Sequence, residues 1–164
     1  GEREITGIDY DEEKILTAGH CFSKNEKIRF LYGDAMDFGD VMYDCIIMAD
    51  MLHYLQPDQQ SALVIKALAH LAPGGLVLAS TINRTLRSYL AAIVGAELIF
   101  RVLPRGTHRW AQFVRPAELQ HCAVACGLVP VERRGMAYLP AIHRAWWTRS
   151  LSVNYIASFG KPST

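Results

Sequence analysis

LAPGGLVLAS, residues 71–80, indicates the fold class of this chain more clearly than any other segment. The helical spacing of residues 57–71 ends here, because the proline and two glycines at 73–75 interrupt a helix. The apolar run that follows, residues 76–81, is typical of a buried strand. A helix that leads through a tight turn into a buried strand is half of a βαβ unit, so the segment predicts an α/β fold.

The sequence before this segment alternates in the same way. Apolar runs predict strands at Glu4–Asp9, Lys27–Tyr32 and Tyr43–Met48, and helical spacing predicts a helix at Asp11–Phe22. Strands that alternate with helices of this length form parallel sheets with right-handed crossovers. We therefore expect a three-layer α/β domain with a mainly parallel sheet.

The C-terminal third predicts a different edge to this sheet. Pro116–Cys126 has helical spacing and Gly127 follows as its C-terminal cap. Leu128–Arg134 and Leu151–Phe159 read as two further strands, which we expect to form an antiparallel pair at the edge. Residues 84–112 fit neither pattern and form an insertion.

Length and composition limit the class of protein. A chain of 164 residues, 51% of them apolar, suits a single domain over residues 1–164 and excludes an intrinsically disordered chain. The four cysteines include no CxxC pair, so we expect reduced thiols and no cysteine zinc site. The longest apolar run, residues 89–103, is too short and too charged to span a membrane. We predict no signal peptide at the start and no nucleic-acid partner.

The charge is divided unevenly along the chain. Residues 1–80 carry six Lys/Arg against thirteen Asp/Glu, and residues 81–164 carry eleven against three. A net charge of −7 followed by +8 predicts a basic face for an anionic partner. The alternative is that the charge is simply spread unevenly.

Several polar residues follow directly after predicted strands, where ligands of parallel sheets bind. Asp9 could accept the ribose hydroxyls of an adenosyl group, with Tyr10 beside it; the alternative is a helix N-cap. Asp34 could accept the adenine amino group while the backbone of Ala35 contacts the ring; the alternative is a turn aspartate. Ala49 follows the third strand and completes the predicted cofactor-binding set.

The order of these elements resembles that of class I methyltransferases. Asp9, Gly33-Asp34-Ala35, Tyr43-Asp44, Leu52-His53 and the LxPGG turn appear in the succession found in that family. The resemblance implies a Rossmann-like sheet and S-adenosylmethionine as the cofactor. The glycine-rich GxGxG loop of the family is missing, since the sequence contains no GxG. We therefore expect a chain truncated at its N-terminus that binds the cofactor weakly.

The second half carries a more specific resemblance, over residues 79–160. It is similar to the ubiquinone-biosynthesis O-methyltransferase family, whereas residues 1–78 resemble the superfamily only in general. The similarity implies methylation of a phenolic hydroxyl on a polyprenylated catechol-type ubiquinone precursor. The alternatives are a methyltransferase for another small molecule and a non-catalytic, methyltransferase-like fragment. The motifs that carry the similarity are Ser80–Arg84, Ser88-Tyr89, Ile93–Glu97, Leu103–His108, Phe113–Leu119 and Val153–Tyr155.

Asp50 and His53 are the predicted catalytic residues. In the similar family an E-x-x-E-H arrangement at this place is thought to hold a divalent cation; the corresponding residues here are Asp50, His53 and Tyr54. Asp50 and His53, at i,i+3, could assist removal of a phenolic proton whose pKa lies near 10, or could bind a metal. The alternative for His53 is that it only lines the cofactor pocket.

The insertion at residues 84–112 predicts contact with a membrane surface. Leucine, isoleucine and valine recur in it at helical spacing, and the stretch 84–115 has a net charge of +5. The alternative is a lid helix packed on the sheet. A lipid-like phenolic substrate implies a cytoplasmic protein peripheral at a bacterial inner membrane, or one on the matrix side of a mitochondrion, near other ubiquinone-biosynthesis proteins.

Overall fold

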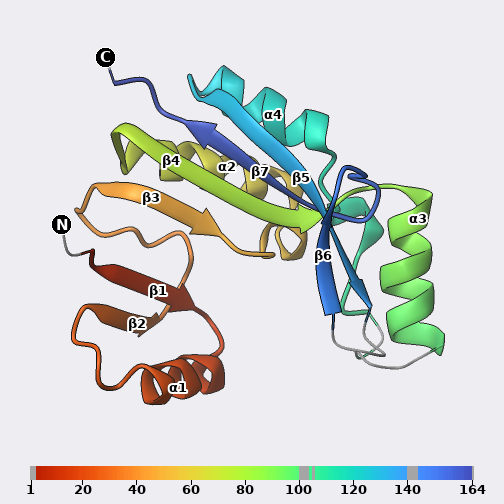
Figure 1. Cartoon of the computed structure of the whole chain (residues 1–164), viewed down its shortest axis with the longest axis horizontal. Coiled ribbons are helices and arrows are strands. Elements are labelled where there is room, and N and C mark those ends of the chain that lie inside the picture. The colour runs from red at the N-terminus through yellow and green to blue at the C-terminus, as the bar shows by residue number, and fades with distance from the viewer. Residues whose placement is uncertain (1–2, 100–103, 105, 140–143, 164) are drawn as a thin grey trace. The chain divides into compact units, whose positions relative to one another are not determined.

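The computed structural model describes residues 3–99, 104, 106–139 and 144–163; for residues 95–99 and 139 it describes the backbone only. The chain divides into two compact units, Gly1–Val41 and Met42–Thr164, which are described separately below (Figure 1).

The first unit is a βαβ element. Strand β1 (Ile5–Asp9) leads into helix α1 (Glu12–Cys21), and β2 (Ile28–Tyr32) pairs with β1 in parallel, with Asp9 opposite Tyr32. Asp11 caps the helix by accepting from the Lys14 amide at 3.3 Å, and two acids in the first turn complement the helix dipole. The predicted strands and helix of this region are confirmed.

The second unit is built on a five-stranded sheet in the order β3-β4-β7-β5-β6 (Figure 1). Strands β3, β4 and β5 run in one direction, and β7 and β6 run in the other. The α/β prediction with parallel strands and an antiparallel C-terminal edge is confirmed. The strands are β3 (Tyr43–Met48), β4 (Leu71–Ile82), β5 (Val129–Leu139), β6 (Arg144–Thr148) and β7 (Asn154–Gly160).

One detail of the predicted edge is wrong: strand β6 was not expected, and it is the outermost strand. The predicted antiparallel pair of Leu128–Arg134 and Leu151–Phe159 is confirmed as β5 and β7. Strand β7 lies between β4 and β5 and pairs antiparallel with both.

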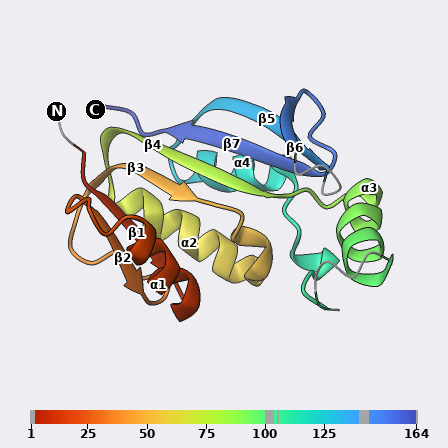
Figure 2. The ribbon, with the colours of Figure 1, turned by 60° about the horizontal axis from the view of Figure 1, so that its bottom comes forward.

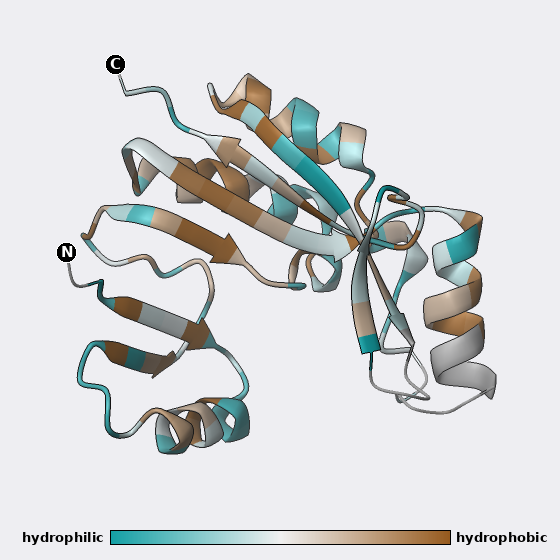
Figure 3. Ribbon diagram, viewed as in Figure 1, coloured by the Kyte–Doolittle hydropathy of each residue, from teal (hydrophilic) through white to brown (hydrophobic). Residues whose placement is uncertain are grey.

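Helices α2 (Pro57–Ala69) and α4 (Pro116–Ala125) cover one face of this sheet (Figure 2). Alternate residues of β4 and β7 are buried, as expected for strands with one face against helices. Figure 3 shows the apolar residues concentrated along β3 and β4. The predicted cap of α4 is confirmed: Gly127 has φ +88, and the Leu128 amide donates to the Ala123 carbonyl at 3.0 Å.

The LxPGG turn differs from its prediction. Helix α2 ends at Ala69 rather than Leu71, and β4 already begins at Leu71, so the turn is an irregular start of the strand. Gly74 has φ +75, which glycine adopts without strain. A Cβ at Gly75 would lie 2.8 Å from the Ala72 carbonyl oxygen and 3.0 Å from that of Asp44 on β3. The second glycine is therefore required by the close approach of two backbones.

The insertion forms a helix that leaves the end of β4 (Figure 1). It begins as α3 (Leu86–Ser88) and continues as the π-helix η2 (Tyr89–Ile99); the short helix η3 (Trp110–Gln112) closes the segment. The Trp110 indole donates to the Thr85 carbonyl at 3.3 Å, so the insertion returns to its own beginning. No helix within the described residues is long and apolar enough to cross a membrane.

Candidate active site

The two predicted adenosyl-binding acids lie at the same edge of the first unit. Asp9 ends β1 and Asp34 follows β2, and the Gly33 amide donates to the Asp9 carbonyl at 3.0 Å. Asp9 Oδ1 accepts from the Asp11 amide at 2.9 Å, and Asp34 Oδ1 accepts from the Met36 amide at 2.8 Å. The turn-stabilising alternatives are thus realised, but within the described residues Oδ2 of each carboxylate accepts no hydrogen bond. Both acids fit a ligand that offers hydroxyl and amino donors.

The other predicted cofactor-binding residues lie beside strand ends. Tyr10 follows Asp9 and is 73% exposed, and Ala35 is half-buried after Asp34. Ala49, in the second unit, is exposed directly after β3. These positions are open enough for a ligand.

Asp50 has an unusual backbone conformation. Its φ of +52 is left-handed, which only a few per cent of non-glycine residues adopt. Its amide donates to Ser80 Oγ at 2.8 Å and to the Ser80 carbonyl at 3.1 Å, so the last residue of LAPGGLVLAS holds the turn after β3. Partial desolvation raises the pKa of the Asp50 carboxyl, and the charge of His108 opposes this. Since 65% of the side chain is exposed, solvent screens the effect.

His53 lies next to Asp50 but is buried. Its side chain is 1% exposed, with Nδ1 3.7 Å from Asp50 Oδ1 and 3.5 Å from Thr81 Oγ1. Burial, aided by the charge of His108, lowers its pKa from 6.5 to about 4, so the imidazole is neutral at pH 7. Its Nε2 is a buried nitrogen without a hydrogen-bond partner among the described residues. The structure therefore brings the two predicted catalytic residues together.

Three aromatic rings surround His53. Tyr54 lies 4.2 Å away between ring centroids, Phe113 meets His53 edge-on at 6.2 Å, and His108 stacks on it at 5.5 Å. His108 was not among the predicted site residues. The signal that could have found it is a titratable side chain at the end of the Leu103–His108 motif, within the insertion beyond β4.

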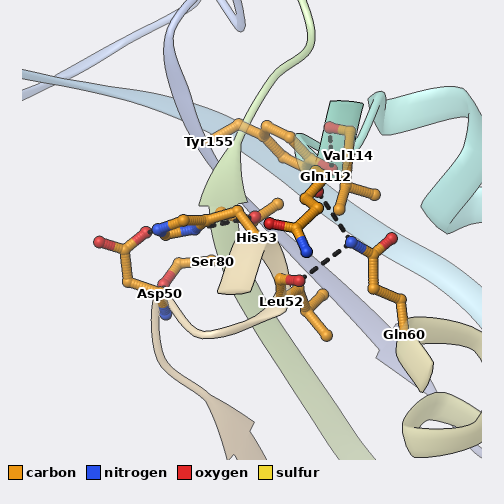
Figure 4. A network of polar contacts seen from close by, with 9 residues as sticks. Asp50, Leu52, His53, Gln60, Ser80, Gln112, Val114 and Tyr155 are labelled. Carbon is orange, nitrogen blue, oxygen red and sulfur yellow. Dashed lines mark hydrogen bonds and ion pairs between the residues drawn. The ribbon is translucent and has the colours of Figure 1, made fainter. Parts of the chain in front are cut away.

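Gln60 fixes the backbone on both sides of this ring cluster (Figure 4). Its side-chain Nε2 donates to the carbonyls of Leu52 and Leu55 at 3.0 Å and of Gln112 at 2.8 Å. The segment that carries His53 and the segment that carries Phe113 are thereby joined to α2. Behind them the buried Tyr155 hydroxyl donates to the Val114 carbonyl at 3.0 Å, and its burial raises the pKa of Tyr155.

A cavity of about 260 Å³ adjoins the cluster, since Leu52 and Phe113 line it together with residues of α2 and α4. An ion pair between Arg84 and Glu118 closes part of its wall. No group of three or more His, Cys, Asp or Glu in the described parts of the chain could hold a metal ion. A divalent cation therefore has no support in this arrangement.

Curated relatives identify the family. The ubiquinone biosynthesis O-methyltransferase of Methylococcus capsulatus is 39% identical over 98% of this chain and 68% of its own length. That of Psychrobacter arcticus is 36% identical over 97% of this chain and 63% of its own length. The chain thus spans about two thirds of these relatives. The similarity covers nearly all of the chain, so it extends well beyond residues 79–160, where it was expected to be specific.

A family model described as a methyltransferase domain matches residues 1–75. The fold is shared with magnesium protoporphyrin IX methyltransferase of Synechocystis with bound S-adenosylhomocysteine, at a TM-score of 0.67 and 16% identity over 96% of this chain and 64% of that one. It is also shared with an N-methyltransferase of Bradyrhizobium japonicum bound to the same product, at a TM-score of 0.65 and 19% identity over 97% of this chain and 67% of that one. The chain belongs to the ubiquinone biosynthesis O-methyltransferase family of class I, S-adenosylmethionine-dependent methyltransferases.

Proposed function

We propose that this protein methylates a phenolic hydroxyl of a polyprenylated, catechol-type ubiquinone precursor, with S-adenosylmethionine as the methyl donor. The observation that carries the proposal is the buried, unpartnered Nε2 of His53 beside Asp50, in a chain 39% identical to an O-methyltransferase of that pathway. In this proposal residues 1–164 act as one methyltransferase domain.

The cofactor-binding part of the proposal assigns one group to each acid. Asp9 would accept the ribose hydroxyls through its unused oxygen, and Asp34 would accept the adenine amino group in the same way. Tyr10 and Ala35 would line the adenosyl group, and Ala49, in the second unit, stays a predicted cofactor-binding residue. When bound, S-adenosylmethionine supplies a methyl group activated by a sulfonium sulfur.

His53 would contact the phenolic oxygen. A buried polar atom without a partner is costly, so a phenolic hydroxyl that forms a hydrogen bond with Nε2 would gain the full benefit of the missing bond. Complete proton transfer from the phenol to His53 is unfavourable. A phenol pKa near 10 and an imidazole pKa of about 4 differ by about 6 units, or about 8 kcal/mol. We therefore assign His53 to orienting the hydroxyl, with Asp50 fixing the edge of the site.

The membrane part of the proposal rests on the exposed face of the insertion. Leu86 is 70% exposed and Leu90 51%, while Ile93 and Val94 are half-buried. Arg87, within α3, and Arg109 are exposed, whereas Arg84 pairs with Glu118 and is less available to lipid. Arg101 and Arg105 lie outside the described residues. An apolar face with basic neighbours suits the surface of an anionic leaflet, and a lipid-like substrate would be collected there.

The substrate assignment is tested by comparing three acceptors with isotopically labelled S-adenosylmethionine. These are a catechol with a short prenyl chain, the same catechol without the chain, and an aromatic amine of similar size. We expect methyl transfer to oxygen, fastest with the prenylated catechol. Preferred transfer to the amine, or transfer to no acceptor despite bound cofactor, would contradict the proposal.

A further inference from the structure

A tight turn lies directly before His108 in the sequence. The Thr107 amide and hydroxyl both donate to the Pro104 carbonyl, at 3.3 and 2.7 Å, and Gly106 has φ +83. Hydrogen bonds from the fourth residue to the first thus close this turn, and glycine stands at its position of positive φ. The position of His108, the next residue, is therefore set by local backbone chemistry.

The ring of His108, which lies far from His53 in the sequence, joins the cluster of aromatic rings around His53. Its ring stacks on that of His53 with an interplanar angle of 29°, and it lies 6.3 Å from Tyr54 and 6.0 Å from Phe113 between centroids. The two imidazoles differ in access to water, since His53 is fully buried and His108 is half-exposed. One imidazole of the pair can thus exchange protons with solvent while the other cannot.

We infer that His108 is the catalytic base that takes the phenolic proton and releases it to water, while His53 orients the same hydroxyl by donating a hydrogen bond from Nε2 to its oxygen. The assignment rests on the proposed function. Among the described residues, Asp50 and His53 both respond to the charge of His108, and the ring of Tyr54 lies beside it. Among these side chains His108 is an imidazole that water can reach, and histidine is the side chain that most often serves as a general base.

The proton and the electrons balance in this assignment. The phenolic O–H bond breaks and its proton passes to a ring nitrogen of His108. The oxygen lone pair forms the new bond to the methyl carbon, while the S–CH₃ bond breaks and its electron pair stays on sulfur. The imidazolium of His108 then loses the proton to water, and the site returns to its starting state.

Two measurements test the inference with His108→Gln, and His121→Gln on α4 serves as the matched exposed control. The first is the pH profile of methyl transfer to 4-methylcatechol. We expect at least a hundredfold fall in kcat for His108→Gln, little change in KM, loss of the acidic limb of the profile, and partial rescue by added imidazole. The control variant should match the wild type. An unchanged profile with kcat within threefold would overturn the inference.

The second measurement needs no turnover. Diethyl pyrocarbonate modification of each histidine is mapped by mass spectrometry, with S-adenosylhomocysteine present and with or without 4-methylcatechol. We expect the catechol to protect His108 and to leave His121 unchanged. Equal modification of His108 in both samples would overturn the inference. If the wild type binds catechol and protects His108 but transfers no methyl group, the proposed function fails for this chain while the contact of His108 with the phenol stands.

Discussion

His53 should make this protein sensitive to acid in a defined pH window. The side chain has an ordinary pKa of 6.5 in the unfolded chain and about 4 in the folded protein. As the pH falls below about 6.5 the unfolded chain takes up a proton first, and the folded protein follows only near pH 4. The unfolded state therefore binds more protons in this window, and the free energy of unfolding falls as the pH is lowered through it.

The size of the effect follows from the shift. A difference of about 2.5 pKa units corresponds to about 3 kcal/mol in full, of which about 2.5 kcal/mol is lost between pH 7.5 and 4.5. The side chain is only 1% exposed, so solvent screening removes little of it. A loss of this size is a large part of the stability of a small domain.

Urea unfolding at pH 7.5 and pH 4.5 measures this loss in the free energy of unfolding, for the wild type and for His53→Gln. Tryptophan fluorescence is a suitable signal, since Trp110, Trp146 and Trp147 all lie in the second unit with His53. We expect the variant to lose about 2.5 kcal/mol less than the wild type on acidification, and His121→Gln to behave as the wild type does. If His53→Gln loses as much as the wild type to within about 0.5 kcal/mol, His53 is not buried as described.

Three further results are expected. Asp9→Ala should weaken S-adenosylhomocysteine binding by about 10- to 150-fold in calorimetry, because charge-assisted hydrogen bonds worth about 1.5–3 kcal/mol are lost. A change below threefold would show that Asp9 only stabilises the turn. Sedimentation with anionic vesicles should fall when Arg101, Arg105 and Arg109 are replaced by Glu, and when Ile93 is replaced by Asp; equal pelleting of all variants would refute membrane contact. Gly75→Ala should lower the free energy of unfolding by about 1–3 kcal/mol through backbone clashes, whereas Gly19→Ala, with open space around its Cβ, should not destabilise; equal stability of the two would show that the LxPGG turn tolerates a side chain.

Much of the fold could be predicted because local signals agreed with each other. Strand β3 begins and ends at the predicted residues, and the cap at Gly127 follows from the single residue type that tolerates its φ. Strand β6 escaped prediction because its sequence, RAWWT, shows no alternation of apolar and polar residues. Within the described residues it pairs with the C-terminal end of β5, with Leu139 opposite Arg144, so its existence depends on pairing with the strand before it rather than on its own pattern.

The site was predictable to a similar extent. Asp50 and His53 could be expected to meet because they are three residues apart after a strand. The stacking of His108 on His53 joins residues 55 positions apart, and no periodicity reports such a contact. The burial of His53 also could not be foreseen, because it depends on Tyr54, His108 and Phe113 together. That burial is why we propose that His53 orients the hydroxyl rather than accepting its proton.

The most direct test of the account is the rate of methyl transfer from S-adenosylmethionine to a prenylated catechol by the wild type and by His53→Gln, with S-adenosylhomocysteine affinity measured in parallel. The account predicts O-methylation by the wild type, a rate at least tenfold lower for the variant, and equal product affinity for both, because His53 contacts the hydroxyl rather than the adenosyl group. Equal rates, or a loss of product affinity that accounts for the lower rate, would contradict the assignment of His53 to the reacting oxygen.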